Sequence, residues 1–524
     1  MDLITAALTG GASVTITTGT GGANSQDGDI TFTANLDFSG TGSNSLSLIA
    51  ADDIIINGQI AATAPLAGDL LDLTLQASNG NATDGDNVQI NNTIYLNGGN
   101  LTINANGAVN QRAGNLAVAA ANINAGAGSI NLTQAANDFT GAVSLNNSGA
   151  NNVAVTDANA INLGASSVGT GTLTVNGVGI TQSGALTQAA AAGAATFNGG
   201  AGAITLTNAA NDFTGAVSLN NSGANNVAIT DVNALNLGTS SVGTGTLTVN
   251  GVGITQSGAL TQAAAAGAAT FNGGGGAITL TNAANDFTGA VSLNNSGANN
   301  VAVTDVNGMT IGASSVGAGL TLTGSAITLD GVIGVGSLSL VSGSAVSGTG
   351  TVTGTGSSSI SGISSFNATT KQSGGVTYNG FASVAGVGTL SGITNYDIGT
   401  GSDGTVTYSG FTTFSGSGSG TLSNGNVWNI TGANSGTVDG ISFSNFANVQ
   451  GTTGADSFVF GASGTLSGSL DGLAGSDTLD WSAYTTARSV ALTGSGGNGF
   501  SGAETSITGG FANIDVLIAP TSTV

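Results

Sequence analysis

The chain has 524 residues and a formal net charge of −23, with no Cys, no His and only three Lys or Arg residues. These absences exclude a Ser–His or Cys–His nucleophile pair and a zinc site built from thiolate or imidazole ligands. They also argue against a nucleic-acid partner, because too few cations are present to neutralise phosphate groups.

The first segment, residues 1–126, contains short alternating apolar runs that predict the N-terminal coils of a β-helix. Asp52 and Asp53 precede an apolar run at residues 54–56, and β-helix glycosidases that cleave pectin use paired carboxylates. Those enzymes also need His, Arg and Lys near the cleft. This chain has no His, and its Arg and Lys residues lie far apart, so we predict a turn here and no enzymatic activity.

The second segment, residues 127–340, holds a long internal repeat. The run Ala-Ala-Asn-Asp-Phe-Thr-Gly occurs around Asp138, Asp212 and Asp286, at a constant spacing of 74 (212 − 138 and 286 − 212). The third copy stays recognisable to about Gly319 and then diverges. We expect each recurring Asp to serve a turn or a ladder, and the Phe after it to line the interior.

Within one repeat, alternating triplets are separated by Asn-Asn, Ser-Gly and Gly-Thr-Gly turns, which predicts strands without a sustained helix. A unit of this length divides into three coils of roughly 25 residues, within the usual range for solenoids. The predicted fold class is all-β, a right-handed parallel β-helix (β-solenoid). Stacking would place equivalent Asn residues, such as Asn151, Asn225 and Asn299, in ladders. The alternative is a set of antiparallel β-sandwich modules.

The third segment, residues 341–450, is rich in Gly and Ser and carries a looser repeat. The run Val-Thr-Tyr at Val376 returns at Val406 and is echoed at Val438, which predicts solenoid coils of a changed length. We expect four aromatic residues to pack in the core, the alternative being exposed surfaces on which sugars stack: Tyr408, Trp428, Trp481 and Tyr484. We expect the three cations to be solvated: Arg112, Lys371 and Arg488.

Four runs of the second repeat carry a family resemblance: Ile-Thr-Leu-Thr (204–207), Asn-Asp-Phe-Thr-Gly (211–215), Asp-Val-Asn-Ala-Leu (231–235) and Gly-Ile-Thr-Gln-Ser-Gly (253–258). Residues 20–340 resemble the filamentous haemagglutinin-type adhesins of Gram-negative bacteria. The resemblance implies a parallel β-helix, secretion through an outer-membrane translocator, and adhesion to host-cell or matrix glycans, proteins or neighbouring cells. Neither the family's secretion domain nor a basic leader is visible, so we expect a piece of a longer exoprotein.

The last segment, residues 451–524, carries two Gly-x-Asp motifs: Gly454 with Asp456, and Gly475 with Asp477. They resemble degenerate calcium-binding nonapeptides of RTX proteins. The resemblance implies a short β-roll-like segment in which these four residues hold Ca²⁺ through oxygen ligands. The family stacks many such motifs, whereas here there are two. The alternative is a turn whose Asp caps backbone N–H groups.

The leading functional hypothesis is a non-catalytic adhesin or exoprotein shaft, secreted or exposed on the surface of a Gram-negative bacterium. The alternatives are a structural component of the cell envelope or biofilm matrix, a calcium-binding RTX-like secreted protein and, remotely, a β-helix polysaccharide lyase or hydrolase. We expect no cofactor other than Ca²⁺. No apolar run is long enough to predict a transmembrane segment.

Overall fold

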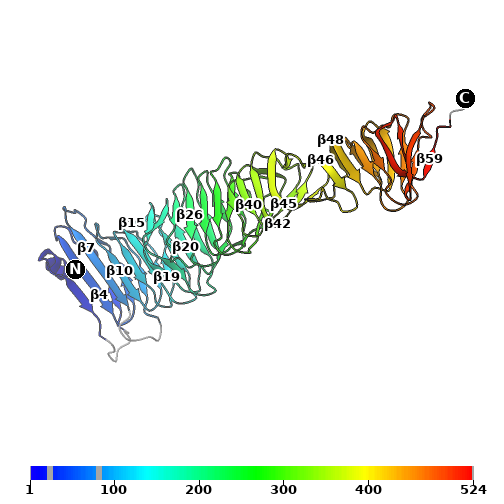
Figure 1. Ribbon diagram of the computed structural model, residues 1–524. Helices are drawn as coiled ribbons and strands as arrows, with labels where there is room; N and C mark the ends of the chain where they lie inside the picture. Colours follow the sequence, from blue (N-terminus) through cyan, green and yellow to red (C-terminus); the bar gives the residue numbers. More distant parts are fainter. Residues whose placement is uncertain (1, 20–27, 78–84, 522–524) are drawn as a thin grey trace. The chain divides into compact units, whose positions relative to one another are not determined.

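The computed structural model describes residues 2–19, 28–77 and 85–521, and the chain divides into two compact units, residues 1–306 and 307–524. Among the described residues the single helix is α1 (Asp2–Thr9), and the remaining regular structure is β-strand. Parallel strands stack coil upon coil within each unit (Figure 1). The predicted all-β parallel solenoid is therefore confirmed.

The first unit begins with coils built on three columns of parallel strands. The first column is β1 (Val14–Thr17), β4 (Ser43–Ala50), β7 (Leu70–Ala77), β10 (Leu101–Ala105), β13 (Ala121–Asn124) and β16 (Ala142–Asn146). The second is β2 (Ile30–Phe32), β5 (Ile54–Ile56), β8 (Val88–Ile90), β11 (Val109–Gln111), β14 (Ile130–Leu132) and β17 (Val153–Thr156). The third is β3 (Leu36–Asp37), β6 (Ile60–Ala61), β9 (Ile94–Tyr95), β12 (Leu116–Val118) and β15 (Asp138–Phe139).

Alternation of residue types explains why these segments form strands. In β10, Leu101 and Ile103 are buried while Thr102 between them is half-buried, which is the period of two expected for a strand with one face on a core. Helix α1 lies against β1 and buries Leu8 completely. The carbonyl of Leu8 accepts a hydrogen bond from Asn44 Nδ2 (3.1 Å), so the helix is fixed to the second strand of the first column.

Two columns continue through the repeats. The first passes through β18 (Ile161–Leu163), β21 (Ile180–Gln182), β24 (Ile204–Leu206), β26 (Val227–Thr230), β29 (Leu247–Asn250), β32 (Ala269–Asn272) and β34 (Val291–Asn294). The second passes through β20 (Leu173–Asn176), β23 (Ala195–Asn198), β25 (Val217–Asn220), β27 (Leu235–Leu237), β30 (Ile254–Gln256), β33 (Ile278–Leu280) and β35 (Val301–Thr304). Short companion strands widen some coils: β19 (Ser166–Val168), β22 (Leu186–Gln188), β28 (Ser240–Val242) and β31 (Leu260–Gln262).

One repeat spans three and a half coils. Seven pairings carry the first column from β16 to β34, and the equivalent residues Val143 and Val291 at its ends lie exactly two repeats apart in the sequence. Two repeats therefore fill seven coils, which makes a mean coil of about 21 residues, at the short end of solenoid repeats. The predicted division into three longer coils is wrong.

The predicted number of coils per repeat was wrong because the turns that join the strands differ in length from coil to coil. The coil from Ile161 to its partner Ile180 is clearly shorter than the next one, which leads from Ile180 to Ile204. The described coils therefore do not share one length, as the division into three assumed.

Equivalent residues consequently alternate between the two columns. Asn146 lies in the first column and Asn220, one repeat later, in the second. Asparagine ladders form instead between different positions of the repeat, as where Asn220 Nδ2 donates to Asn198 Oδ1 (3.0 Å) and Asn198 Nδ2 donates to Asn176 Oδ1 (2.8 Å). The predicted stacking of Asn151 on its own equivalents is wrong, because they lie several coils away.

The second unit is a solenoid with more variable coils. One column contains β37 (Ser314–Ser315), β40 (Val332–Val335), β42 (Thr351–Ile363), β45 (Val376–Gly386) and β47 (Thr407–Ser409). Another contains β43 (Phe366–Asn367), β46 (Thr389–Asp397), β48 (Thr413–Ser423), β52 (Asn448–Gln450), β54 (Leu470–Asp471) and β58 (Ile507–Ile514). A third contains β49 (Val427–Gly432), β53 (Ser457–Phe460), β55 (Thr478–Asp480) and β59 (Val516–Ile518). Further strands complete its first coils: β36 (Gly308–Ile311) pairs with β39 (Ala326–Leu329), and β38 (Gly319–Gly324) with β41 (Ser337–Ser342).

Antiparallel excursions interrupt this second solenoid. They are formed by β44 (Gln372–Ser373) between β43 and β45, by β50 (Ser435–Val438) between β49 and β51 (Ile441–Ser444), and by β56 (Ala491–Gly496) and β57 (Gly499–Glu504) before β58. The last excursion is an antiparallel meander within the segment predicted to be β-roll-like.

The interior is mainly apolar, and Phe139, Phe213 and Phe287 are each 2% exposed, as the repeat predicted. Phe213 meets Phe197 of the second column edge to face, with ring centroids 5.8 Å apart. The strand pairings inside the repeats are parallel, so the antiparallel sandwich alternative does not apply. No helix among the described residues has the length and apolar character to cross a membrane.

Candidate functional site

The four predicted calcium residues lie where two stacked strands begin. Asp456 and Asp477 directly precede β53 and β55, which pair in parallel, so the spacing of the two Asp residues equals one coil. Asp456 is 2% exposed and Asp477 is 0% exposed. Gly475 has φ +131°, and a Cβ atom at this position would lie 2.1 Å from the carbonyl oxygen of Gly454. The glycine of the second Gly-x-Asp motif is thus required by close contact between coils.

Asp456, Asp477 and Asp515 directly precede three stacked strands and so form a column of carboxylates. These carboxylates accept hydrogen bonds from backbone N–H groups. Asp477 Oδ1 accepts from the N–H of Asp456 (2.8 Å), and Asp515 Oδ2 accepts from the N–H of Asp477 (2.9 Å). Asp456 Oδ2 accepts from the N–H of Thr452 (2.7 Å). Among the residues that the structure describes, no group of three or more acidic side chains is arranged to hold a metal ion. The geometry is that of capping carboxylates, the alternative reading of these motifs.

Burial and neighbouring charges determine the pKa values of Asp456 and Asp477. Burial raises the pKa of Asp456. Burial, reinforced by the negative charges of Asp456, Asp515 and Asp471, raises the pKa of Asp477 to about 6. Asp477 Oδ2 is buried and has no hydrogen-bond partner within the described part of the chain. The charged form of Asp477 is therefore disfavoured in the folded chain.

This raised pKa predicts that the C-terminal coils gain stability as the pH falls. Between the ordinary pKa of 3.8 and about 6, the folded chain binds a proton at Asp477 that the unfolded chain does not. Lowering the pH from 7 to 5 should stabilise these coils by about 1–2 kcal/mol, since a tenfold difference in proton affinity is worth about 1.4 kcal/mol. Tryptophan fluorescence during thermal unfolding would measure it. Asp477→Asn should remove most of the difference between the two pH values, the rest belonging to Asp456, whose pKa is also raised, and an unchanged difference in that variant would refute the assignment.

The repeated Asn-Asp-Phe motif has a structural role. Asn211 is fully buried, and its Oδ1 accepts hydrogen bonds from Gln182 Nε2 (2.8 Å) and the N–H of Leu186 (2.9 Å). The N–H of Phe213 donates to Asp231 Oδ2 (2.8 Å). These groups of the repeat are used to join coils, so they are not available to a ligand. Asp53, which directly precedes β5, has a comparable role, because its Oδ1 accepts the N–H of Asn87 (2.7 Å).

One cation was placed wrongly from the sequence. The side chain of Arg488 is only 14% exposed and forms an ion pair with Glu504 (2.7 Å), whose side chain is fully buried. Its guanidinium also lies 4.0 Å from the centre of the Tyr484 ring. Trp428, Trp481 and Tyr484 are buried as predicted.

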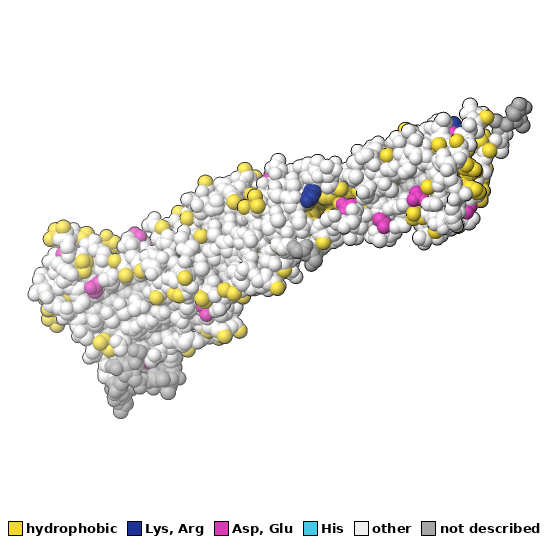
Figure 2. All heavy atoms as spheres, viewed as in Figure 1, with side chains coloured by type: hydrophobic (Ala, Val, Ile, Leu, Met, Phe, Trp, Pro, Cys, Tyr) yellow, Lys and Arg dark blue, Asp and Glu magenta, His cyan; other side chains and the backbone are white. Residues whose placement is uncertain are grey.

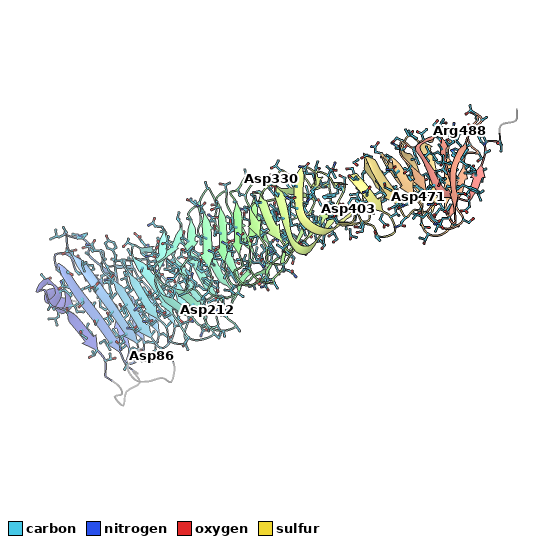
Figure 3. The ribbon with its side chains drawn as sticks, viewed as in Figure 1. Asp86, Asp212, Asp330, Asp403, Asp471 and Arg488 are labelled. Carbon is cyan, nitrogen blue, oxygen red and sulfur yellow. The ribbon has the colours of Figure 1, made fainter. Side chains whose placement is uncertain are left out.

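A small aromatic cavity in the second unit is the site that the sequence did not reveal. It has a volume of about 330 Å³, and its walls include Phe366, Tyr378, Phe381 and Tyr408, with Lys371 and Asp403 at its polar side. Burial raises the pKa of the Tyr378 phenol. Burial and a hydrogen bond to Asp403 raise the pKa of Tyr408, so both phenols stay protonated at neutral pH. Figure 3 labels Asp403 in this part of the second unit.

Comparison with known proteins identifies the repeats alone. Residues 71–146, 150–220 and 224–294 match a family described as Repeats of unknown function (DUF5649). The first match begins before residue 127, so the repeat reaches into the coils predicted to precede it. No curated protein and no solved structure matches the chain.

Proposed function

We propose that this chain is the non-catalytic shaft of a secreted or surface-exposed bacterial protein that mediates attachment or builds the cell envelope or biofilm matrix. The observation that carries the proposal is that the recurring polar groups of the repeat, such as Asn211, are used between coils. Repetition then supplies length and surface. The resemblance to filamentous haemagglutinin-type exoproteins supports the same role, with release through an outer-membrane translocator.

The surface supports weak, multiple contacts with neutral partners. Charged residues form 6% of the chain, and Figure 2 shows one face on which charged side chains are sparse. Such a surface presents hydroxyl and amide groups at repeated positions. Contacts of this kind gain strength by multivalency and need no single strong site.

Surface exposure is the direct test of this proposal. An antibody raised against the purified chain should label intact cells as strongly as permeabilised cells, and beads coated with the chain should attach to host cells or to matrix. Beads coated with an unrelated acidic protein of similar size provide the control. Labelling that requires permeabilisation would exclude a surface shaft. Surface labelling without bead attachment would restrict the function to the envelope or matrix.

A further inference from the structure

The last antiparallel excursion of the second unit ends in a strand with one free edge. In the two earlier excursions, β44 lies between β43 and β45, and β50 lies between β49 and β51. Strand β56 pairs within the described residues with β57 alone, and all six of its residues are exposed. Because β57 pairs with β58 and β58 with β54, this edge ends a column of strands. Its outer N–H and C=O groups are a template for one more strand.

The free edge lacks the features by which proteins protect such strands. Natural edge strands carry charged side chains or proline, which hinder pairing with another chain. Residues 489–503 contain no charged residue and no proline, although the whole chain has a net charge of −23. The charged residues on either side of this run, Arg488 and Glu504, are paired with each other (2.7 Å), and Figure 3 labels Arg488 in these coils. A second uncharged strand can therefore approach β56 without local repulsion.

The inward face of this meander is only partly covered. In β57, Phe500, Gly502 and Glu504 alternate with their neighbours and so share one face. Gly502 and Glu504 are buried on that face, whereas Phe500 is 42% exposed. Gly502 pairs with Phe511 of β58 on one side and with Leu492 of β56 on the other. Phe511 is 3% exposed and Leu492 is 55% exposed, so the apolar face that begins in the core continues uncovered to the free edge.

A second copy of the same strand suits this edge. Two identical strands pair antiparallel when a two-fold axis relates them, and two-fold symmetry is the commonest symmetry of protein dimers. Two chains that are both strongly acidic can meet most easily where neither carries a charge, which is the case at β56. A basic partner is disfavoured here, because the segment offers no carboxylate to attract it.

We propose that the chain forms a dimer in which β56 of one copy pairs antiparallel with β56 of a second copy. The pairing satisfies the outer backbone groups of both strands and places the uncovered Leu492 of each copy against apolar surface of the other. The column of β54, β58, β57 and β56 then continues through both copies and joins them through their C-terminal coils. A single strand pair is a small contact, so we expect a weak dimer with a dissociation constant of roughly 1–100 µM.

Sedimentation velocity of the purified full chain over a range of concentrations, up to about 200 µM, measures this association. Leu492→Lys should weaken the dimer about tenfold or more, because it removes an apolar contact and places like charges near each other across the pairing. Val387→Lys is the matched control, since Val387 lies in the turn between β45 and β46 and is 71% exposed. This control should dimerise as the wild type does, and both variants should keep the wild-type Tm, which shows that each is folded.

Cysteine cross-linking tests the direction of the pairing. The chain has no Cys, so a single introduced Cys can form a disulfide only between two copies. Four variants place it along β56: Ala491→Cys, Leu492→Cys, Thr493→Cys and Ser495→Cys. In an antiparallel pair, each step away from the two-fold axis separates the two copies of a residue by about 7 Å more, and a disulfide needs Cα atoms within about 7 Å. Cross-linking should therefore be confined to one or two neighbouring positions, and Val387→Cys should give none.

The proposal goes beyond the shaft function, and its failure would leave the surface-labelling result untouched. It is overturned if the wild type stays monomeric at the highest concentration, an outcome that would leave the edge to a strand of a different protein. It is also overturned if Leu492→Lys dimerises as well as the wild type, which would assign the association to another surface. Cross-linking at none of the four positions, or at all four as in a parallel pair, would overturn it as well.

Discussion

Asn211→Ala should lower the free energy of unfolding of the first unit by about 3–4 kcal/mol, because alanine leaves several buried groups unpaired and each costs about 1–3 kcal/mol. The side chain is fully buried, and besides Gln182 and the N–H of Leu186 it serves two carbonyl oxygens through Nδ2, those of Leu206 (3.1 Å) and Thr230 (3.2 Å). Thermal unfolding, with hydrogen exchange at the N–H of Leu186, measures the loss.

Asn208 provides the matched control in the same turn. It is only half-buried, and its Oδ1 accepts a single local hydrogen bond from the N–H of Ala210 (2.9 Å). Asn208→Ala should therefore change the stability by no more than about 0.5 kcal/mol. Asn137→Ala and Asn285→Ala should reproduce the large effect, because both side chains are fully buried as well. Equal losses for Asn208→Ala and Asn211→Ala would show that the buried amide has no special role.

Arg488→Ala should destabilise the C-terminal meander by about 3–5 kcal/mol, the cost of leaving a buried charge without its partner. Glu504 would keep its hydrogen bond from the N–H of Ser506 (2.7 Å) but lose its counter-ion. The double variant Arg488→Met with Glu504→Gln should recover most of the loss, since it removes both charges. Arg112→Ala, at an exposed position, is the control for removing a cation.

The destabilisation caused by Arg488→Ala should decrease as the pH falls. Burial alone would raise the pKa of Glu504, but hydrogen bonds from Ser506 and Arg488 outweigh it and hold the pKa below its usual range. The stabilisation is therefore complete above the ordinary pKa of Glu and is lost as the pH falls through the folded value. Urea unfolding of wild type and Arg488→Ala should show a large difference at pH 7 that shrinks in acid. A difference independent of pH would point to lost packing on Tyr484.

The sequence was sufficient to predict the strands and the residues that face the interior. Alternation identified the buried positions, and the recurrence of Phe139 as Phe213 and Phe287 placed these rings in the interior. The number of coils per repeat could not be predicted, because a period of 74 residues is compatible with three coils and with three and a half. The choice depends on turn lengths, which vary from coil to coil without a distinct sequence signal.

The misplaced and missed residues belong to the antiparallel excursions of the second unit. Arg488 meets Glu504 because β56 and β57 fold back on each other, and no periodic pattern marks that reversal. Lys371 and Tyr378 were visible as residues, but their cavity also needs Asp403 and Tyr408 from the next coil. Contacts of this kind arise from stacking, so a linear reading of residue types does not predict them.

Because one repeat spans three and a half coils, only some of the repeat copies can bind one planar surface. Corresponding residues such as Asn146 and Asn220 lie in different strand columns, so successive copies present the same chemical groups on different faces of the solenoid. A planar surface, such as a membrane or a crystalline polysaccharide, would engage every second copy only. The effective valency toward that surface is then half the copy number, and the copies left over face away, ready to join a second surface or a neighbouring molecule.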